Sequence, residues 1–333
     1  MDKWKITTFV VKSRLIGPTI KPNIMHDDND GPLRNPTASK TPNFRYDTSV
    51  IIAVYNNFHW LRLILDALRM QSVKDFEVVI ADDGSSDETV GHIRKYMEQH
   101  PELPIVHAWQ PDEGWRKNKC LNGAIRKSSG EYLVFIDGDC IPHPRFVEDH
   151  RRLRKKGIVT GGRRVESGPA LNELVESWTE LPADYFSQAR KNIIHQLFHE
   201  KTGLVMSQLR RTIRFPFIGG KALGKKNRGI LGANFGIYRE DIERVNGFDE
   251  RYVDPGTGED CDLDIRLSHA GIRHVKASHY ALMIHRHHPR LFWGAQNNAD
   301  LFKAAKENHL TYIPTGLNQP SESSSQKIEE SES

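Results

Sequence analysis

Short apolar runs rich in β-branched residues recur at a regular interval in the first half of the chain. They read TSVIIAV at Thr48–Val54, FEVVIA at Phe76–Ala81, PIVHAW at Pro104–Trp109 and EYLVFI at Glu131–Ile136. Their starts are separated by 28, 28 and 27 residues, a spacing that fits one strand and one helix each time. Runs that are apolar throughout indicate a parallel sheet covered on both faces by crossover helices.

The stretches between these runs carry helix signals. Phe58, Leu61, Leu65 and Leu68 line one face of the first stretch. In the second, SSDE at Ser85–Glu88 has the spacing of a capping box and predicts the start of a helix. The pattern predicts an α/β, Rossmann-like sheet of the nucleotide-binding kind, with ligands at the carboxyl ends of its strands.

The alternation loosens in the second half of the chain. We expect further strands and helices, in chain order, at Leu231–Tyr238 (strand), Arg239–Val245 (helix), Asp260–Ala270 (helix), Ile272–Lys276 (strand) and His279–Ile284 (strand). The span from about residue 171 to residue 228 is predicted to be helical and then loop-like. This span indicates an insertion rather than another repeat.

The two ends differ from the regular middle. Residues 1–47 hold scattered Pro, Asn and Asp without a sustained period, so we expect an irregular N-terminal arm. Residues 318–333 are polar and free of aromatic side chains, which is typical of a disordered tail. One main domain is therefore predicted over residues 48–317, interrupted by the helical basic insertion at about 171–228.

Location is indicated by what the sequence lacks. It has no run of about 18 apolar residues and no leader-like cleavage pattern. Its three cysteines, Cys120, Cys140 and Cys261, lack metal-type spacing. We expect a cytoplasmic protein whose thiols are small buried groups.

The formal net charge of +4 hides a strongly basic segment. Between residues 183 and 228 only Asp184 and Glu200 oppose a run of basic residues, which are Arg190, Lys191, Lys201, Arg210, Arg211, Arg214, Lys221, Lys225, Lys226 and Arg228. This run also carries phenylalanines, namely Phe186, Phe198, Phe215 and Phe217. It suits the phosphates of a nucleic acid, an anionic lipid or a phosphorylated glycan.

Polar clusters follow the predicted strands. VYNN comes after the first strand and makes Val54 and Asn56 candidates for donor binding, while ADDGS follows the second. A carboxylate of this run, Asp82 or Asp83, can accept a hydrogen bond from a base N–H or a ribose hydroxyl. The alternative is an ordinary Asp/Gly turn before a helix.

Asp137-Gly138-Asp139 follows the fourth strand. Two carboxylates flanking a glycine can hold Mg²⁺ or Mn²⁺, which completes its coordination with diphosphate oxygens. The same spacing also occurs in loops without a metal. Upstream, Arg116 and Lys119 open a predicted helix, and cations at that end suit a bound diphosphate. The alternative is a solvated basic first turn.

Two later clusters complete the candidate chemistry. Glu259 and Asp260, in the GTGEDCD segment, begin a helix, and Asp260 is a candidate general base. A helix-capping cluster is the alternative. Three histidines in MIHRHHP follow a predicted strand, and one of them can be a metal ligand, although the region is His-rich and a surface or phosphate-binding role is open.

Five segments together resemble inverting family 2 glycosyltransferases, and specifically the bacterial branch whose C-terminal half is like the galactosyltransferase and chondroitin-polymerase proteins. They are SVIIAVYNN, ADDGSSD, DEGWRKNKCLNGAI, YLVFIDGDCIPHPRFVEDH and GFDERYVDPGTGEDCDLDIRL, and the match runs from about Ser49 to Pro289. The resemblance implies a GT-A-like, nucleotide-sugar-binding α/β fold whose C-terminal elements lie on the acceptor side.

The resemblance also implies residue roles. Asp82 recognises the uracil of a UDP donor, with Asp83 beside it; Arg116 and Lys119 approach the nucleotide. It further implies that Asp137, with Gly138, lies on the ribose side and that Asp139 binds the metal. Glu259 would hold a sugar, and Asp260 would be the base. The further metal ligand would be His285, with His288 as its rival. The chain departs from related galactosyltransferases before the GED run, where it has Asp254-Pro-Gly-Thr instead of an aromatic residue. Acceptor stacking therefore has no candidate.

We expect a metal-dependent inverting transfer of a hexosyl or N-acetylhexosaminyl group from a UDP-sugar to a glycan or lipid-linked glycan, in bacterial cell-envelope polysaccharide or lipopolysaccharide biosynthesis. The cofactor is Mn²⁺ or Mg²⁺. The basic insertion is expected to contact an anionic inner membrane surface or a phosphorylated acceptor, and no nucleic-acid partner is expected. The rivals are a binding module without catalysis, a nucleotidyltransferase and a nucleic-acid-binding protein.

Overall fold

The computed structural model describes residues 44–166, 168–199, 203–214, 230, 232–255, 259–277, 279–288 and 296–318. Most of the expected N-terminal arm and C-terminal tail lies outside these residues. So does the loop-like part of the predicted insertion, at residues 215–229.

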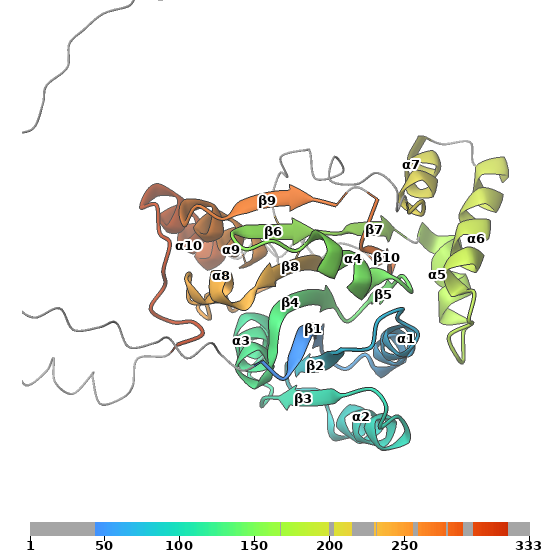
Figure 1. The fold of residues 1–333 in the computed structure, drawn as a ribbon, viewed down its shortest axis with the longest axis horizontal. Coiled ribbons are helices and arrows are strands. Elements are labelled where there is room, and N and C mark those ends of the chain that lie inside the picture. Colours follow the sequence, from blue (N-terminus) through green and yellow to red (C-terminus); the bar gives the residue numbers. More distant parts are fainter. Residues whose placement is uncertain are drawn as a thin grey trace, which may run out of the picture. The chain divides into compact units, whose positions relative to one another are not determined.

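Parallel strands form the first half of the main sheet, and helices connect these strands (Figure 1). These elements are β1 (Tyr46–Val54), α1 (Phe58–Arg69), β2 (Phe76–Asp82), α2 (Asp87–Gln99), β3 (Ile105–Trp109), α3 (Lys117–Lys127) and β4 (Gly130–Asp137). The strands lie in the order β3-β2-β1-β4 and each is parallel to its neighbours within this set, which confirms the predicted α/β sheet. The segments after β1, β2 and β4 therefore meet at one edge.

Each central strand contributes to two cores. On β1, Val50 and Ile52 pack in one cluster, whereas Ile51 packs in another with Leu121 and Ala124 of α3. Side chains alternate between the two faces of a strand, so a run that is apolar throughout is buried on both faces. This burial explains the spacing of apolar runs in the sequence.

Three further strands complete a seven-stranded sheet of order β3-β2-β1-β4-β8-β6-β9. They are β6 (Ile158–Gly161), β8 (Asn234–Tyr238) and β9 (Arg273–Lys276). β8 is antiparallel to both β4 and β6. The expected strands near residues 231–238 and 272–276 are thus present, while β6 was not predicted.

A second sheet has the order β5-β10-β7. Its strands are β5 (Cys140–Pro142), β7 (Arg163–Glu166) and β10 (Leu282–His285), with β10 antiparallel to β5 and parallel to β7. The sequence predicted no strand at β5 or β7. The Cys-Ile-Pro segment forms a strand because it pairs with β10, far along the chain.

The remaining described helices flank these sheets. They are α4 (Phe146–Leu153), α5 (Gly168–Glu176), α6 (Tyr185–His199), α7 (Gly203–Arg211), α8 (Arg239–Glu243), α9 (Glu259–His269) and α10 (Gln296–Glu307). α5, α6 and α7 follow β7 and group together at one side of the molecule (Figure 1). Within the described residues, every helix is too short or too polar to cross a membrane.

Two local expectations are corrected. The capping box at Ser85–Glu88 does not form: α2 begins at Asp87, its N-cap residue is Ser86, and no side chain caps it. Ser85 instead accepts a hydrogen bond from the Asn56 N–H at 2.9 Å, because the end of β1 lies beside it. Cys261 is exposed, so the expectation of buried thiols holds only for Cys120 and Cys140.

Candidate active site

A cavity of about 1300 Å³ opens at the carboxyl edge of the parallel strands. Its wall includes Val54 at the end of β1, Asp83 after β2 and Asp137 at the end of β4. The opposite wall comes from the insertion, with Ile193 of α6 and Gln208 of α7. Pockets for one small ligand usually measure roughly 300–1,000 Å³, so this cavity is larger than a single small ligand requires.

The two aspartates after β2 have different surroundings. Asp82 is fully buried and lies outside the cavity lining, with its Oδ1 accepting the Ser85 N–H at 2.8 Å and its Oδ2 lying 2.8 Å from His107 Nε2. Burial acts to raise the pKa of Asp82, but these contacts outweigh it and the pKa is lowered. Asp83 lines the cavity, and burial raises its pKa. Asp83 is therefore the carboxylate that a ligand can reach.

The turn after β1 is tied to the turn after β2. Asn56 adopts a positive φ of 48°, and its Oδ1 accepts the Ser86 N–H at 2.8 Å. Asn56 is thus engaged in the turn and lies outside the cavity lining, whereas Val54 and Tyr55 line it. Sequence reasoning did not single out Tyr55, whose hydroxyl donates to Asp112 at 3.0 Å. An aromatic residue directly after a strand end was the available signal.

The start of α3 presents a different cation from the two predicted. Lys117 lines the cavity, and its Nζ donates to Asp137 Oδ1 at 2.9 Å. Lys119 lies outside the lining and pairs with Glu113 at 3.0 Å. Arg116 is the N-cap residue of α3 and contributes its backbone N–H to Asp83 at 2.9 Å. A helical first turn directs Lys117 and Lys119 differently, which spacing alone did not reveal.

Gly138 separates the two carboxylates after β4 for a steric reason. A Cβ at this position would lie 2.5 Å from the Ala53 carbonyl oxygen of β1. Its neighbours face different partners, since Asp137 contacts Lys117 while Asp139 contacts histidines. The turn therefore needs glycine to bring both carboxylates to the cavity.

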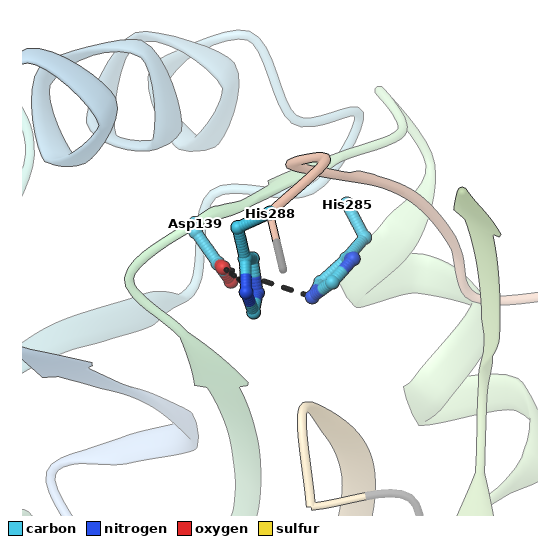
Figure 2. Close-up of side chains that lie close together, drawn as sticks. All are labelled: Asp139, His285 and His288. Atoms are coloured by element: carbon cyan, nitrogen blue, oxygen red, sulfur yellow. Dashed lines mark ion pairs between the residues drawn. The ribbon is translucent and has the colours of Figure 1, made fainter. Parts of the chain in front are cut away.

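Asp139, His285 and His288 converge on the cavity wall (Figure 2). One ligand atom from each lies within 4.8 Å of the others. Asp139 Oδ2 is 3.6 Å from His285 Nε2 and 3.3 Å from His288 Nε2. Burial acts to raise the pKa of Asp139, but the two histidines outweigh it and the pKa is lowered. A carboxylate and two imidazoles form a donor set that fits a divalent cation.

Glu166 supports this group, although sequence reasoning missed it. The register of the small sheet places His285 beside Glu166 on β7 and opposite Cys140 on β5. His285 Nδ1 donates to Glu166 Oε2 at 2.9 Å, so its Nε2 is left facing Asp139. Burial acts to raise the pKa of Glu166, but His285 and Arg164 lower it to about 2. A charged glutamate thus sets the tautomer of His285.

Asp260 lies near the large cavity without lining it. It lines a small neighbouring cavity of about 20 Å³, whose wall shares Ala53, Lys117 and Asp137 with the large one. Its Oδ2 accepts the Gly232 N–H at 3.4 Å. The side chain of Glu259 lies outside the described part of the structure.

The basic insertion is partly structural. Arg214 forms a bidentate ion pair with the buried Asp149, at distances down to 2.6 Å, and only 11% of its side chain is exposed. Arg214 is therefore engaged inside the fold and does not add to a basic surface. Arg190, Lys191 and Arg210 are exposed.

Comparison with known proteins identifies the fold type and the family of the chain. The solved structure of GalNAc-T7 with UDP, GalNAc and Mn²⁺ superposes with a TM-score of 0.51 at 13% identity, covering 80% of this chain and 48% of that one. The likeness confirms that the fold is of the GT-A type. The family model described as glycosyl transferase family 2 matches residues 49–245, and the model described as the N-terminal domain of galactosyltransferase matches residues 222–289. The chain belongs to glycosyl transferase family 2.

Similar curated proteins are sugar transferases by name. Validoxylamine A glucosyltransferase of Streptomyces hygroscopicus subsp. jinggangensis is 30% identical over 239 residues, which cover 67% of this chain and 52% of that protein. Chondroitin synthase of Escherichia coli is 24% identical over 276 residues, covering 78% of this chain and 37% of that protein. The chain thus spans about half the length, or less, of these relatives.

Proposed function

We propose that the chain is a metal-dependent inverting glycosyltransferase that moves a hexosyl or N-acetylhexosaminyl group from a UDP-sugar to a hydroxyl of a glycan or lipid-linked glycan. The observation that carries this proposal is the convergence of Asp139, His285 and His288 on the wall of one large cavity at the carboxyl edge of the sheet. The names of its relatives support sugar transfer. The process that we infer for this reaction is polysaccharide or lipopolysaccharide assembly.

The donor nucleotide occupies the side of the cavity formed by β1, β2 and α3 in this proposal. Asp83 reads the base, because it lines the cavity while Asp82 is enclosed. Tyr55 offers an exposed ring against which a base can pack. Asp137 accepts a ribose hydroxyl, and Lys117 beside it faces the negative charge of the diphosphate.

Asp139, His285 and His288 hold the cation in this proposal. Mg²⁺ prefers oxygen ligands, so two imidazole nitrogens favour Mn²⁺ over Mg²⁺. When bound, the metal supplies positive charge that stabilises the departing diphosphate. Glu166 keeps the Nε2 of His285 directed at the site through its bond to Nδ1.

Asp260 acts as the general base in this proposal, taking the proton of the acceptor hydroxyl as it attacks. Its support is its position in a small cavity that shares Lys117 and Asp137 with the large one. Glu259 stays a candidate for holding a sugar. The acceptor enters from the insertion side, where α6 and α7 form the wall.

We also propose that exposed basic residues of α6 and α7 contact an anionic membrane surface. Lys191 and Arg210 are exposed, and Phe198 near them in the chain is 75% exposed. An amphipathic basic surface of this kind binds anionic lipid headgroups. The membrane would bring a lipid-linked acceptor to the insertion side of the cavity.

The test is UDP release from a panel of UDP-sugars with Mn²⁺ and then with EDTA, comparing wild type, Asp139→Ala and the control Asp87→Ala, whose exposed carboxylate lies outside the cavity lining. We expect release from one donor that requires Mn²⁺, survives in the control and is lost in Asp139→Ala. Activity that persists in Asp139→Ala with EDTA would refute the metal assignment. Nucleotide binding without turnover across the panel would instead support a binding module.

A further inference from the structure

The loop that carries His285 and His288 is held by the first helix of the insertion. We propose that Asn172 and Glu176 of α5 are positioning residues that clamp this loop and thereby set the affinity of the metal site. The metal part of this inference rests on the proposed function; the clamp itself rests on contacts within the chain.

Two contacts join α5 to the loop. The Asn172 Oδ1 accepts the backbone N–H of His287 at 3.1 Å. The Glu176 Oε1 lies 3.2 Å from Arg286 Nε in an ion pair. Asn172 and Glu176 are four residues apart, so they share one face of the helix. Both loop residues that they hold lie between the two histidines.

The held residues connect directly to Asp139. The Arg286 backbone N–H donates to the Asp139 carbonyl oxygen at 3.0 Å. Displacement of Arg286 would therefore disturb the aspartate as well as the histidines. We expect His288 to be displaced more easily than His285, because 45% of its side chain is exposed against 11% for His285. His285 has Glu166 as an additional anchor.

Glu176 also contacts α1. Its Oε1 accepts the Trp60 indole N–H at 2.8 Å, and its Oε2 lies 3.5 Å from His59 Nε2. The Arg286 guanidinium also lies over the Trp60 ring, 5.7 Å from its centroid. α1 begins just after Asn57, a residue that lines the cavity. Glu176 thus links the metal loop to the helix that follows the donor-side turn.

The position of α5 is determined by the core. Leu171 and Val175 are fully buried in the larger hydrophobic cluster. α5 also begins two residues after Glu166, the residue that orients His285. The segment that includes β7 and α5 therefore contacts the metal group in two places. Glu166 on β7 contacts His285, and the clamp on α5 contacts the loop between the two histidines. The insertion has a role in metal binding besides lining the acceptor side.

The clamp can be tested without metal, by amide hydrogen exchange at Arg286 and His287 in wild type, Asn172→Ala, Glu176→Gln and the double variant. Glu173→Gln is the matched control, since Glu173 is an exposed glutamate on the same helix. Glu176→Gln retains an acceptor for the Trp60 indole but loses the charge that attracts Arg286. We expect exchange at these two amides to rise at least fivefold in the double variant, with the control and the midpoint of thermal unfolding little changed.

The second measurement is Mn²⁺ affinity by titration. Partners outside the ligand shell typically change metal affinity by about 10–100-fold, and we expect about tenfold weaker binding in the double variant. Unchanged exchange in the double variant would overturn the clamp. Faster exchange with unchanged Mn²⁺ affinity would overturn its role in metal binding. If wild type bound no Mn²⁺ while exchange still rose, the proposed metal site would fail and the clamp on the loop would stand.

Discussion

The donor side and the metal side of the cavity are built in different ways. The donor side comes from β1 to β4, a continuous stretch in which β1 pairs with β2, β2 with β3, and β1 with β4. The metal group comes from β10 and from the residues next to β5 and β10, two strands that pair although about half of the described chain separates them. Glu166 on β7 comes from a third segment between them.

This difference shows which parts of the site depend on distant pairing. On the donor side, the strand ends meet because consecutive parallel strands share one edge. On the metal side, His285 reaches Asp139 only because β10 inserts between β5 and β7. We therefore expect changes near the small sheet to act on metal affinity, and changes near β1 to β3 to act on the donor nucleotide.

Among the variants that test this comparison, we expect Asp260→Asn to have the largest effect, which is on the rate. Loss of a general base typically lowers the rate by about 10²–10⁴-fold. Because Asp260 lies outside the metal group, Mn²⁺ affinity should be unchanged. Single-turnover rates and Mn²⁺ titrations measure the two quantities separately. A normal rate in this variant would remove Asp260 from the mechanism.

Glu166→Ala should weaken Mn²⁺ binding by about 10–100-fold, since it frees the orientation of His285. Glu166→Gln should lie between this variant and wild type, because its amide retains an acceptor without the charge. A titration with Mn²⁺, monitored by electron paramagnetic resonance, measures the Mn²⁺ affinity. Equal affinities in all three proteins would mean that the small sheet does not orient the ligand.

Two variants on the donor side test different roles. Asp83→Asn tests a proposed contact with the nucleotide, and Asp82→Asn tests support of the fold. We expect Asp83→Asn to weaken UDP binding about tenfold, which matches a hydrogen bond of a charged group worth about 1.5 kcal/mol. Asp82→Asn should mainly lower the midpoint of thermal unfolding, because it removes the carboxylate that His107 contacts. Calorimetry with UDP and thermal unfolding of both variants test this. The reverse pattern would restore Asp82 as the base-reading residue.

The smallest effect is expected for a change in the insertion, measured as binding to anionic vesicles. Each basic residue near an anionic membrane contributes about 1 kcal/mol, so Arg210→Gln should reduce binding to anionic vesicles about fivefold. Asp184→Asn is a control on the same segment with the opposite charge change. Arg214 is unsuitable for this test, because its replacement leaves Asp149 buried without its ion pair. Equal binding of wild type and Arg210→Gln would exclude a membrane role for Arg210.

Several details depended on geometry that sequence patterns do not carry. Lys117 rather than Lys119 faces the cavity, because direction around a helix depends on where the helix begins. The expected capping box failed because Ser85 bonds to the turn after β1. Cys261 is exposed although cysteines are usually buried.

The sequence by itself determined the parallel sheet and the edge at which the cavity opens, because the apolar runs and their spacing are local properties of the chain. Only the tertiary structure decided which aspartate faces the cavity after β2, which lysine accompanies Asp137, and how Glu166 and α5 hold the histidines. These choices rest on pairings between distant segments, whose register is set by the packing of the whole core.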